Sequence, residues 1–544
     1  MKKTLLSIAT ILMALIVVVS CKKKDEEDNS NDPISVQTVS LDQTSYSLAI
    51  GGTVTLTASI YPETATNKSL VWTSDNVSVA TASGSGTTCT VTAVSEGTAN
   101  ITVFAADDAS ISAKCVITVS TTVKPVVTVK DSISVNTIWT SDNIYLIKGY
   151  LYVTAGAKLT IQAGTIVKGE KASKGTLIVE RGGKIEAIGT STNPIVMTSD
   201  QAPGERTYGD WGGLIICGKA QINVAGGQAQ VEGGPRSYYG GTDDADNSGT
   251  LQYVRIEFAG IPLVQDKETN GLTLGAVGSG TTIDHIQVSY CGDDSYEWFG
   301  GTVNCKYLVA FRGWDDEFDT DYGFRGKIQF AIGLRDALIA DASTSNGFES
   351  DNDGSGSNNT PVTKAIFSNV SLFGPKKSST TDPVNSNYGR GLHLRRNTKT
   401  SLYNSIVVGW PTGVYIDGFA SQNNATNDDL QIRNTIIAGN QSNFGVPPSS
   451  TVFVDAAALR TWFSTSGWGN DTLATVADLQ ISNPYNYTAP NFKPATDSPV
   501  RNKADFTNTN VSTFFDQVTF VGAMGDTDWT AGWCNWTPIQ TIYQ

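Results

Sequence analysis

The sequence predicts an all-β protein in which a small β-sandwich precedes a large parallel β-helix, and three observations lead to that prediction. The 544 residues include 53 glycines, and many short segments are rich in Val, Ile and Thr. In residues 35–121 these segments are separated by turn residues at the regular spacing of a sandwich. From residue 125 to residue 544, apolar-alternating segments recur as near-copies, which is typical of a coil of repeats.

Residues 1–20 have the pattern of an export signal, with two early lysines, an apolar middle and a small residue before Cys21. The sequence VVSC resembles a bacterial lipobox, which implies that Cys21 is acylated and anchors the chain in outer-membrane lipid. Residues 21–34 are then a solvated acidic tether. An acidic cluster after such a cysteine resembles the surface-export signal of Bacteroidota lipoproteins, which implies display on the cell exterior. The alternative is a plain spacer that faces the periplasm.

The first folded domain is predicted over residues 35–121, where five alternating segments run from VTLTASI to KCVITV. Its strings VWTSDN and VTAVSEGTANI resemble those of a bacterial Ig-like group 2 domain, which implies a stalk or an adhesive module. Cys89 and Cys115 fall in this domain and are candidates for a disulfide. The later cysteines lie in apolar or aromatic contexts, such as LIICG and GWCNW, that are typical of buried free thiols.

The repeats of the second domain, 125–544, can be aligned directly. Residues 292–297 (GDDSYE) match residues 314–319 (WDDEFD) at an offset of 22, and residues 391–394 match residues 413–416 at the same offset. A coil of 22 residues suits a helix with three short sheets per turn. Strings such as GDWGGLIICG and SNGFESDND resemble right-handed β-helix surface proteins of Bacteroidota, which implies that fold without a settled activity. We expect the segment DTDWTAGWCNW to cap the last coil.

The alignment stacks acids on successive coils, about one strand spacing of 4.8 Å apart. Like charges in that position repel each other, and one Ca²⁺ ion can bridge two such carboxylates. Two further segments place oxygen ligands at alternate positions before a glycine, although neither has the later Glu of an EF-hand. The alternative is that all these acids are solvated on exposed turns. The candidate calcium ligands are Asp293, Asp294, Glu297, Asp315, Asp316, Asp319, Asp321, Glu349, Asp351, Asp353, Asp244 and Asp246.

Aromatic residues crowd the same region, and exposed rings beside carboxylates suit sugars. The candidate ligand-binding residues are Tyr296, Trp298, Trp314 and Tyr322. The alternative is that alternate members of the set fill the core of the coil. The formal net charge of -14 argues against nucleic acid as a partner.

The sequence therefore predicts a cell-surface lipoprotein that acts in binding or adhesion, with a glycan or an envelope protein as its partner. A calcium-dependent polysaccharide lyase or a glycoside hydrolase is the alternative, and an accessory subunit of an outer-membrane uptake complex is the second. Gly292-Asp293-Asp294 is similar to a polygalacturonase motif, but the Gly-His-Gly and Arg-Ile-Lys motifs of those enzymes are missing. No catalytic residue is assigned. The arginines that could act as a lyase base are Arg312, Arg325, Arg335, Arg395 and Arg396.

Overall fold

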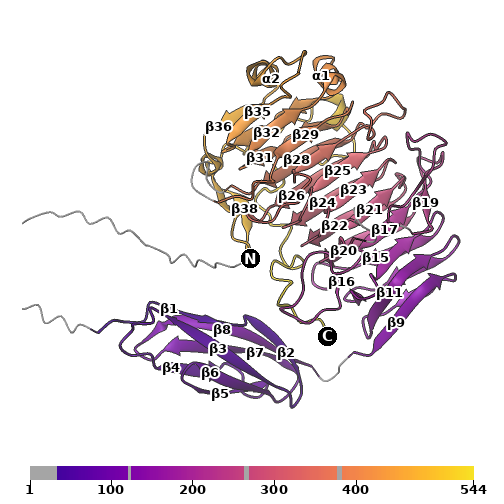
Figure 1. Cartoon of the computed structure of the whole chain (residues 1–544). Helices are drawn as coiled ribbons and strands as arrows, with labels where there is room; N and C mark the ends of the chain where they lie inside the picture. Colours follow the sequence, from indigo (N-terminus) through magenta and orange to yellow (C-terminus); the bar gives the residue numbers. More distant parts are fainter. Residues whose placement is uncertain (1–32, 121–123, 234, 263–268, 377–382) are drawn as a thin grey trace, which may run out of the picture. The chain divides into compact units, whose positions relative to one another are not determined.

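The computed structural model describes residues 33–120, 124–233, 235–262, 269–376 and 383–544 (Figure 1). The predicted signal peptide, Cys21 and almost all of the acidic tether lie outside the described residues. The chain forms two compact units that divide between Val119 and Ser120, and the predicted all-β fold is confirmed. Among the described residues, no helix is long and apolar enough to cross a membrane.

The first unit is a sandwich of two four-stranded sheets. One sheet has the order β1 (Thr38–Leu41), β3 (Thr53–Tyr61), β6 (Thr88–Ala93) and β5 (Ala80–Ser85). The other has the order β2 (Ser45–Ala49), β8 (Asp108–Ser120), β7 (Gly97–Ala105) and β4 (Leu70–Ser74). We assign β2 to this unit because its hydrogen-bonded neighbour is β8.

The proposed disulfide of the sandwich is not formed, because Cys89 and Cys115 are both free thiols. They lie on opposite sheets, Cys89 on β6 and Cys115 on β8, and each is buried in the apolar core. Burial raises the pKa of the Cys115 thiol to about 12. The predicted free thiols of the second unit are confirmed, and three of the four are buried.

The second unit is a parallel β-helix with three series of strands, as the coil length predicts. The first series, which we call the site sheet, follows the second half of β11 and consists of β14 (Thr176–Val179), β17 (Leu214–Cys217), β21 (Leu272–Gly275), β23 (Tyr296–Phe299), β25 (Phe318–Asp321), β27 (Phe348–Ser350), β29 (Arg390–Leu394), β32 (Thr412–Ile416) and β35 (Ser442–Gly445).

The other two series share five long strands: β20 (Gly249–Glu257), β22 (Thr282–Ser289), β24 (Asn304–Phe311), β26 (Lys327–Leu334) and β28 (Ile366–Phe373). The second series consists of the first halves of these long strands, preceded by β10 (Thr137–Trp139), β12 (Lys158–Ile161) and β15 (Lys184–Ile188) and followed by β30 (Ser401–Tyr403) and β33 (Ile432–Arg433). The third series consists of the second halves of the long strands, preceded by β9 (Val126–Ile133), β11 (Ile144–Val153), β13 (Ile166–Gly169) and β16 (Ile195–Ser199) and followed by β31 (Ile406–Val408), β34 (Ile436–Ala438) and β36 (Asp471–Leu473).

A left-handed residue bends each long strand at its middle. Tyr253, His285, Tyr307 and Phe330 have φ between 50° and 60° at this point. Such a backbone is costly for residues other than glycine. Their rings stack on one another across successive coils, with centroids 4.3, 4.3 and 4.9 Å apart, and this stacking offsets part of the cost.

The pairing confirms the predicted register. Tyr296 lies opposite Phe318, Ile286 lies opposite Leu308, and the third copy pairs Phe318 with Phe348 after a longer insertion. The later alignment holds as well, with Leu392 opposite Val414. The remaining short elements are β18 (Ala229–Gln230), β19 (Tyr238–Tyr239), β37 (Ile481–Asn483), β38 (Asn491–Pro494), α1 (Phe419–Thr426), α2 (Ala456–Phe463), η1 (Val476–Leu479) and η2 (Thr509–Val511).

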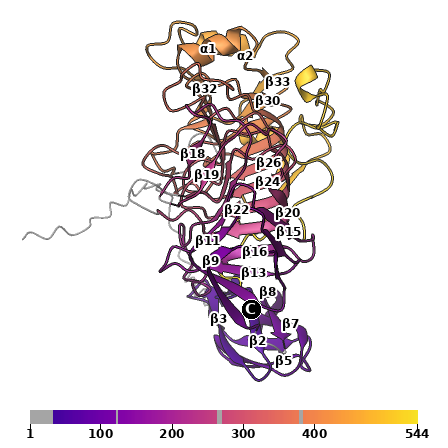
Figure 2. The same cartoon turned by 90° about the vertical axis from the view of Figure 1, so that its right-hand side faces the viewer.

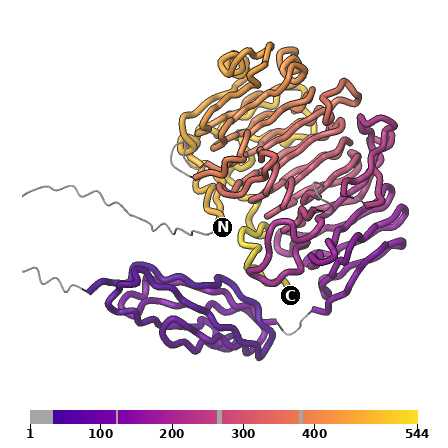
Figure 3. The backbone as a smooth tube through the Cα atoms, in the orientation of Figure 1, coloured from indigo at the N-terminus to yellow at the C-terminus, as the bar shows by residue number. Residues whose placement is uncertain are grey.

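The predicted cap of the last coil is wrong, because another segment covers that end. α1 and α2 lie together there (Figure 2), and Phe463 of α2 is fully buried against Phe444 of β35. The C-terminal residues instead return along the side of the β-helix to its first coils (Figure 3). Asn535 donates to Gln287, and Tyr543 donates to Glu257 at 2.7 Å. The segment has no repeat of its own, so periodicity could not place it.

Candidate functional site

Three acids form a column on the outer face of the site sheet. Glu297 on β23 pairs with Asp319 on β25, which pairs with Glu349 on β27. Because side chains alternate along a strand, these residues point outward while their neighbours point into the core. We call Glu297, Asp319 and Glu349 the acidic column.

The end of the column at Glu349 is neutralised by the next coil. Arg395 forms an ion pair with Glu349, and the His393 ring nitrogen lies 3.4 Å from the same carboxylate. Burial alone would raise the pKa of Glu349, but the His393 contact and the Arg395 charge bring it below its usual value. Arg395 and Arg396 also pair with Asp351, each at 2.8 Å. These acids therefore have cations supplied by the chain.

The other end of the column has no such partner. Oxygens of Asp294, Glu297 and Asp319 all lie within 4.8 Å of one another. Burial raises the pKa of each of the three carboxyls well above its usual value, and the neighbouring acids raise it further. None of the three forms an ion pair with any residue that the structure describes, and Asp319 Oδ1 is buried without a hydrogen bond.

A second group shares Asp294. Oxygens of Asp293, Asp294 and Asp315 also lie within 4.8 Å of one another. Burial, followed by the charge of Asp316, raises the pKa of Asp315 to about 8. The structure thus brings together most of the carboxylates that the offset of 22 predicts.

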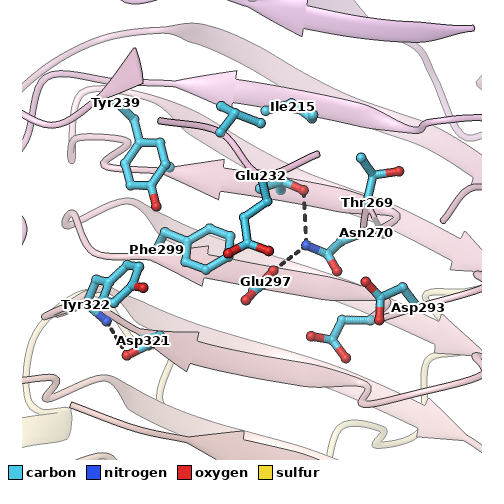
Figure 4. A pocket seen from close by; sticks show the side chains of 14 residues that line it. Ile215, Glu232, Tyr239, Thr269, Asn270, Asp293, Glu297, Phe299, Asp321 and Tyr322 are labelled. Carbon is cyan, nitrogen blue, oxygen red and sulfur yellow. Dashed lines mark hydrogen bonds between the residues drawn. The ribbon is translucent and has the colours of Figure 1, made fainter. Parts of the chain in front are cut away.

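An amide lies beside the first group. Asn270 precedes β21 and is 4% exposed. Its Nδ2 donates to Glu297 and to Thr273, whereas its Oδ1 is buried and accepts no hydrogen bond. Figure 4 shows the amide oxygen on the side of Asp293, facing carboxylates rather than a donor. Sequence reasoning missed this residue, although the pairing of Leu272 with Tyr296 places Asn270 in register with Asp294.

From these groups, Asn270, Asp293, Asp294 and Glu297 line a cavity of about 270 Å³, which we call the acidic cavity. Burial raises the pKa of Asp321, at its edge, to about 8. Three aromatic rings form the side opposite Asn270 (Figure 4). Phe299 stacks on Tyr239 with ring centroids 5.7 Å apart, and it meets Tyr322 at a tilt with centroids 5.6 Å apart. The lining residues that carry chemistry are Glu232, Asn270, Asp293, Asp294, Glu297, Asp321, Tyr239, Phe299 and Tyr322.

The predicted aromatic residues divide between the core and the surface. Tyr296 and Trp298 are fully buried, so the prediction that they bind a ligand is wrong. They flank the outward-facing Glu297 on β23, and the alternation of the strand turns both into the core. Tyr322 lines the acidic cavity and Trp314 is exposed, so both are open to a ligand.

Asp316 has a structural partner instead of an open site. Its carboxylate accepts a hydrogen bond from the backbone N–H of Asn346 on the next coil. Asp294 Oδ1 likewise accepts from the N–H of Asp316 at 2.8 Å. This ladder ties successive coils together at the start of the site sheet.

The two predicted loops outside the column engage protein partners. Asp244 pairs with Arg325 at 3.1 Å, and Asp246 accepts from Ser248. Asp353 accepts from Ser355 and Ser357 within its own turn. Within the described part of the chain, these acids lie outside both groups that could hold a metal ion.

The candidate lyase arginines are all paired with acids. Besides Arg325, Arg395 and Arg396, Arg312 pairs with Asp336. Arg335 pairs with Glu317 at 3.0 Å, and both side chains are fully buried. Burial alone would lower the pKa of Arg395, but the neighbouring acids raise it above its usual value and hold the guanidinium charged, which is unfavourable for a base.

The fold and this site define a parallel β-helix protein with an acidic cavity on one sheet. The family of pectate-lyase-like β-helix domains matches residues 131–479, which are more than half of the sequence, so the chain belongs to that family. The bacterial Ig-like domain (group 2) family matches residues 35–117. No curated protein matches the chain.

Solved structures match a small part of the chain. Domains 4 and 5 of the S-layer protein SbsC are 27% identical over 16% of this chain and 53% of theirs, with a TM-score of 0.14. Domains 1–6 of the surface layer protein SbsC are also 27% identical, over 16% of this chain and 13% of theirs, with a TM-score of 0.14. The chain thus spans between about an eighth and about half of the length of these structures.

In a buffer that contains a metal chelator, the protein should become less stable as the pH rises from 5 to 8.5. Asp315 and Asp321, with pKa values of about 8, keep protons in the folded state that the unfolded chain releases near pH 4. Between the unfolded pKa near 4 and the folded pKa of about 8, the folded state binds more protons than the unfolded chain. The free energy of unfolding therefore falls by up to about 1.4 kcal/mol per pH unit for each carboxyl as the pH rises. Thermal melting in EDTA measures this trend.

The double variant Asp315→Asn, Asp321→Asn is the matched control and should show a flatter profile. A wild-type melting temperature that stays level or rises over this range would contradict the assigned protonation.

Proposed function

We propose that the acidic cavity binds a calcium ion and that the cation and the adjoining rings together bind a glycan at the cell surface. One observation carries the proposal: oxygens of Asp294, Glu297 and Asp319 lie within 4.8 Å of one another, and no cationic side chain of the described residues forms an ion pair with the three acids. The unpartnered Asn270 amide oxygen lies buried beside them. Removing charges from water without a partner is costly. A bound cation would offset that cost.

The ligand set favours calcium over other metals. All the ligand atoms are oxygens, whereas zinc and copper sites use histidine or cysteine. Calcium takes carboxylate and amide oxygens at about 2.3–2.6 Å, so two ligands on opposite sides of one ion lie about 4.8 Å apart. The spacing of the three carboxylates falls within that limit.

The cavity favours a glycan over an envelope protein as the partner. Half-buried rings at Phe299 and Tyr322 can stack on the apolar face of a sugar while carboxylates accept from its hydroxyls. A cavity of about 270 Å³ suits a single sugar unit better than a protein surface.

Calcium titration by isothermal calorimetry tests the proposal. Wild-type protein should bind calcium and melt at a higher temperature in calcium than in EDTA. Glu297→Gln or Asp319→Asn should weaken binding at least about tenfold, which is about 1.4 kcal/mol. Asp526→Asn, at a surface acid that is 83% exposed, is the matched control and should bind like wild type. Equal melting in calcium and EDTA, with no binding heat, would exclude the cation.

Glycan hydrolysis is the second candidate function, and the pKa of Asp321 favours it. A carboxyl with a pKa of about 8 is protonated at neutral pH, as a general acid must be. Release of reducing ends from polysaccharides is the measurement, and Asp321→Asn should abolish it while Asp526→Asn retains it. Activity that survives in Asp321→Asn would contradict the assignment. A lyase mechanism has less support because acids hold Arg395 charged.

We further propose that Cys21 is acylated and that the acidic tether and the Ig-like unit carry the β-helix away from the membrane. Two or more acyl chains make a lasting anchor, at about 0.8 kcal/mol per buried CH₂. Metabolic labelling with a palmitate analogue should mark the wild-type chain in the membrane fraction, and Cys21→Ala should lose the label and become soluble. An unlabelled wild-type chain would contradict the anchor. An accessory role in an uptake complex would add a membrane partner that co-purifies.

A further inference from the structure

Trp314 is an exposed aromatic residue beside the acidic cavity. It is the most exposed tryptophan of the chain, at 38%, whereas Trp139, Trp211, Trp298 and Trp410 are almost entirely buried. Exposing an indole ring to water forgoes the free energy that burial of its apolar surface provides. An exposed ring of this size next to a cavity is therefore a candidate contact for a ligand.

The backbone at Trp314 is held in place. Its carbonyl accepts hydrogen bonds from Arg335 Nη2 at 3.1 Å, Ser345 Oγ at 2.8 Å and the Asp341 N–H at 3.1 Å. Its N–H donates to Cys291, and Tyr208 meets the indole edge to face at 5.3 Å. A ring fixed in this way loses little conformational entropy when a ligand stacks on it.

A second cavity, of about 610 Å³, lies at Trp314. Part of its lining is bare backbone at Gly209, Gly260 and Gly292, where a Cβ on Gly292 would meet the Gly209 nitrogen at 2.8 Å. Carboxylates of Asp293, Asp315 and Asp341 line it as well. We call this cavity the Trp314 subsite.

The charge of the lining selects the class of ligand. Carboxyl groups accept hydrogen bonds from hydroxyl groups, and a protonated carboxyl such as that of Asp315 also donates one, whereas an ionised carboxylate repels phosphates, sulfates and uronates. An aromatic face beside hydroxyl acceptors is the combination that holds a pyranose ring. The Trp314 subsite is therefore matched to an uncharged sugar.

The two cavities adjoin each other. Asp293 lines both the acidic cavity and the Trp314 subsite. The residues from Trp314 to Tyr322 cross the site sheet from one cavity to the far edge of the other, about 26 Å if fully extended. A linear chain of several sugars can thus occupy both cavities together.

We propose that the Trp314 subsite binds a neutral sugar unit of a linear oligosaccharide, another unit of which enters the acidic cavity. The inference rests on the proposed function, since it takes the glycan as the ligand of that cavity. Trp314 stacks on one unit, and the cation with Phe299 and Tyr322 holds another.

The test is a fluorescence and calorimetric titration of full-length protein with neutral hexasaccharides of β-1,4-glucan, β-1,4-mannan, β-1,4-xylan and β-1,3-glucan, with hexagalacturonate as the charged comparison. At least one neutral hexasaccharide should bind more tightly than hexagalacturonate and quench tryptophan emission. Trp314→Ala should weaken its binding at least about tenfold, and Trp314→Phe should restore most of it. Phe419→Ala removes a ring that is 68% exposed outside both cavities and should change nothing.

Two outcomes would overturn the Trp314 subsite: wild type binding none of the neutral hexasaccharides in calcium, or Trp314→Ala binding as tightly as wild type at an unchanged melting temperature. Repeating the titration in EDTA separates this inference from the cation. Binding that depends on Trp314 but not on calcium would leave the subsite standing and remove the metal. Calcium binding together with glycan binding that Trp314→Ala leaves unchanged would retain the metal and remove the Trp314 subsite.

Discussion

The structure depends on the register of parallel coils, because this register sets which charges must lie side by side. Hydrogen bonding fixes neighbouring strands about 4.8 Å apart, and no side-chain movement can separate two matched positions widely. The pairing of Glu297 with Asp319 and of Asp319 with Glu349 therefore places like charges in contact. The chain has to neutralise them with cations or with protons.

The same column shows both solutions. Glu349 is met by Arg395 and by His393, and its pKa falls. Glu297 and Asp319 form no ion pair with the described residues, and their pKa values rise. Glu317, two residues before Asp319, forms a fully buried ion pair with Arg335, which demonstrates that this chain can supply an arginine to a buried acid. Three carboxyls of this site thus have raised pKa values and no ion pair to the described residues, at a position where Glu317 and Glu349 are paired, and perturbed acids of this kind are typical of a binding site.

Much of the fold could be predicted because repetition leaves a strong signal. The offset of 22 residues gave the register of β23 with β25, and with it the contact of Asp294, Glu297 and Asp319. The burial of Tyr296 and Trp298 also follows from that register once Glu297 is turned outward. The C-terminal segment could not be placed, because it has no period and its contacts are to residues up to 335 positions away.

Other parts of the site required coordinates. Asn270 carries no charge and lies outside the aligned repeats, so only the pairing of β21 with β23 brings it to the acids. The loops around Asp244 and Asp353 have the sequence pattern of cation ligands, yet Arg325 and two serines occupy their oxygens. A sequence pattern specifies which ligand atoms are available, whereas competition from nearby donors decides which remain open.

The most direct measurement of the central claim is an anomalous-difference map from crystals grown with a calcium-mimicking lanthanide such as terbium. The account predicts one strong peak within about 2.6 Å of oxygens from Asp294, Glu297, Asp319 and Asn270. A map without a peak there, in which these carboxylates are splayed into solvent and the Asn270 oxygen accepts an ordinary hydrogen bond, would contradict it.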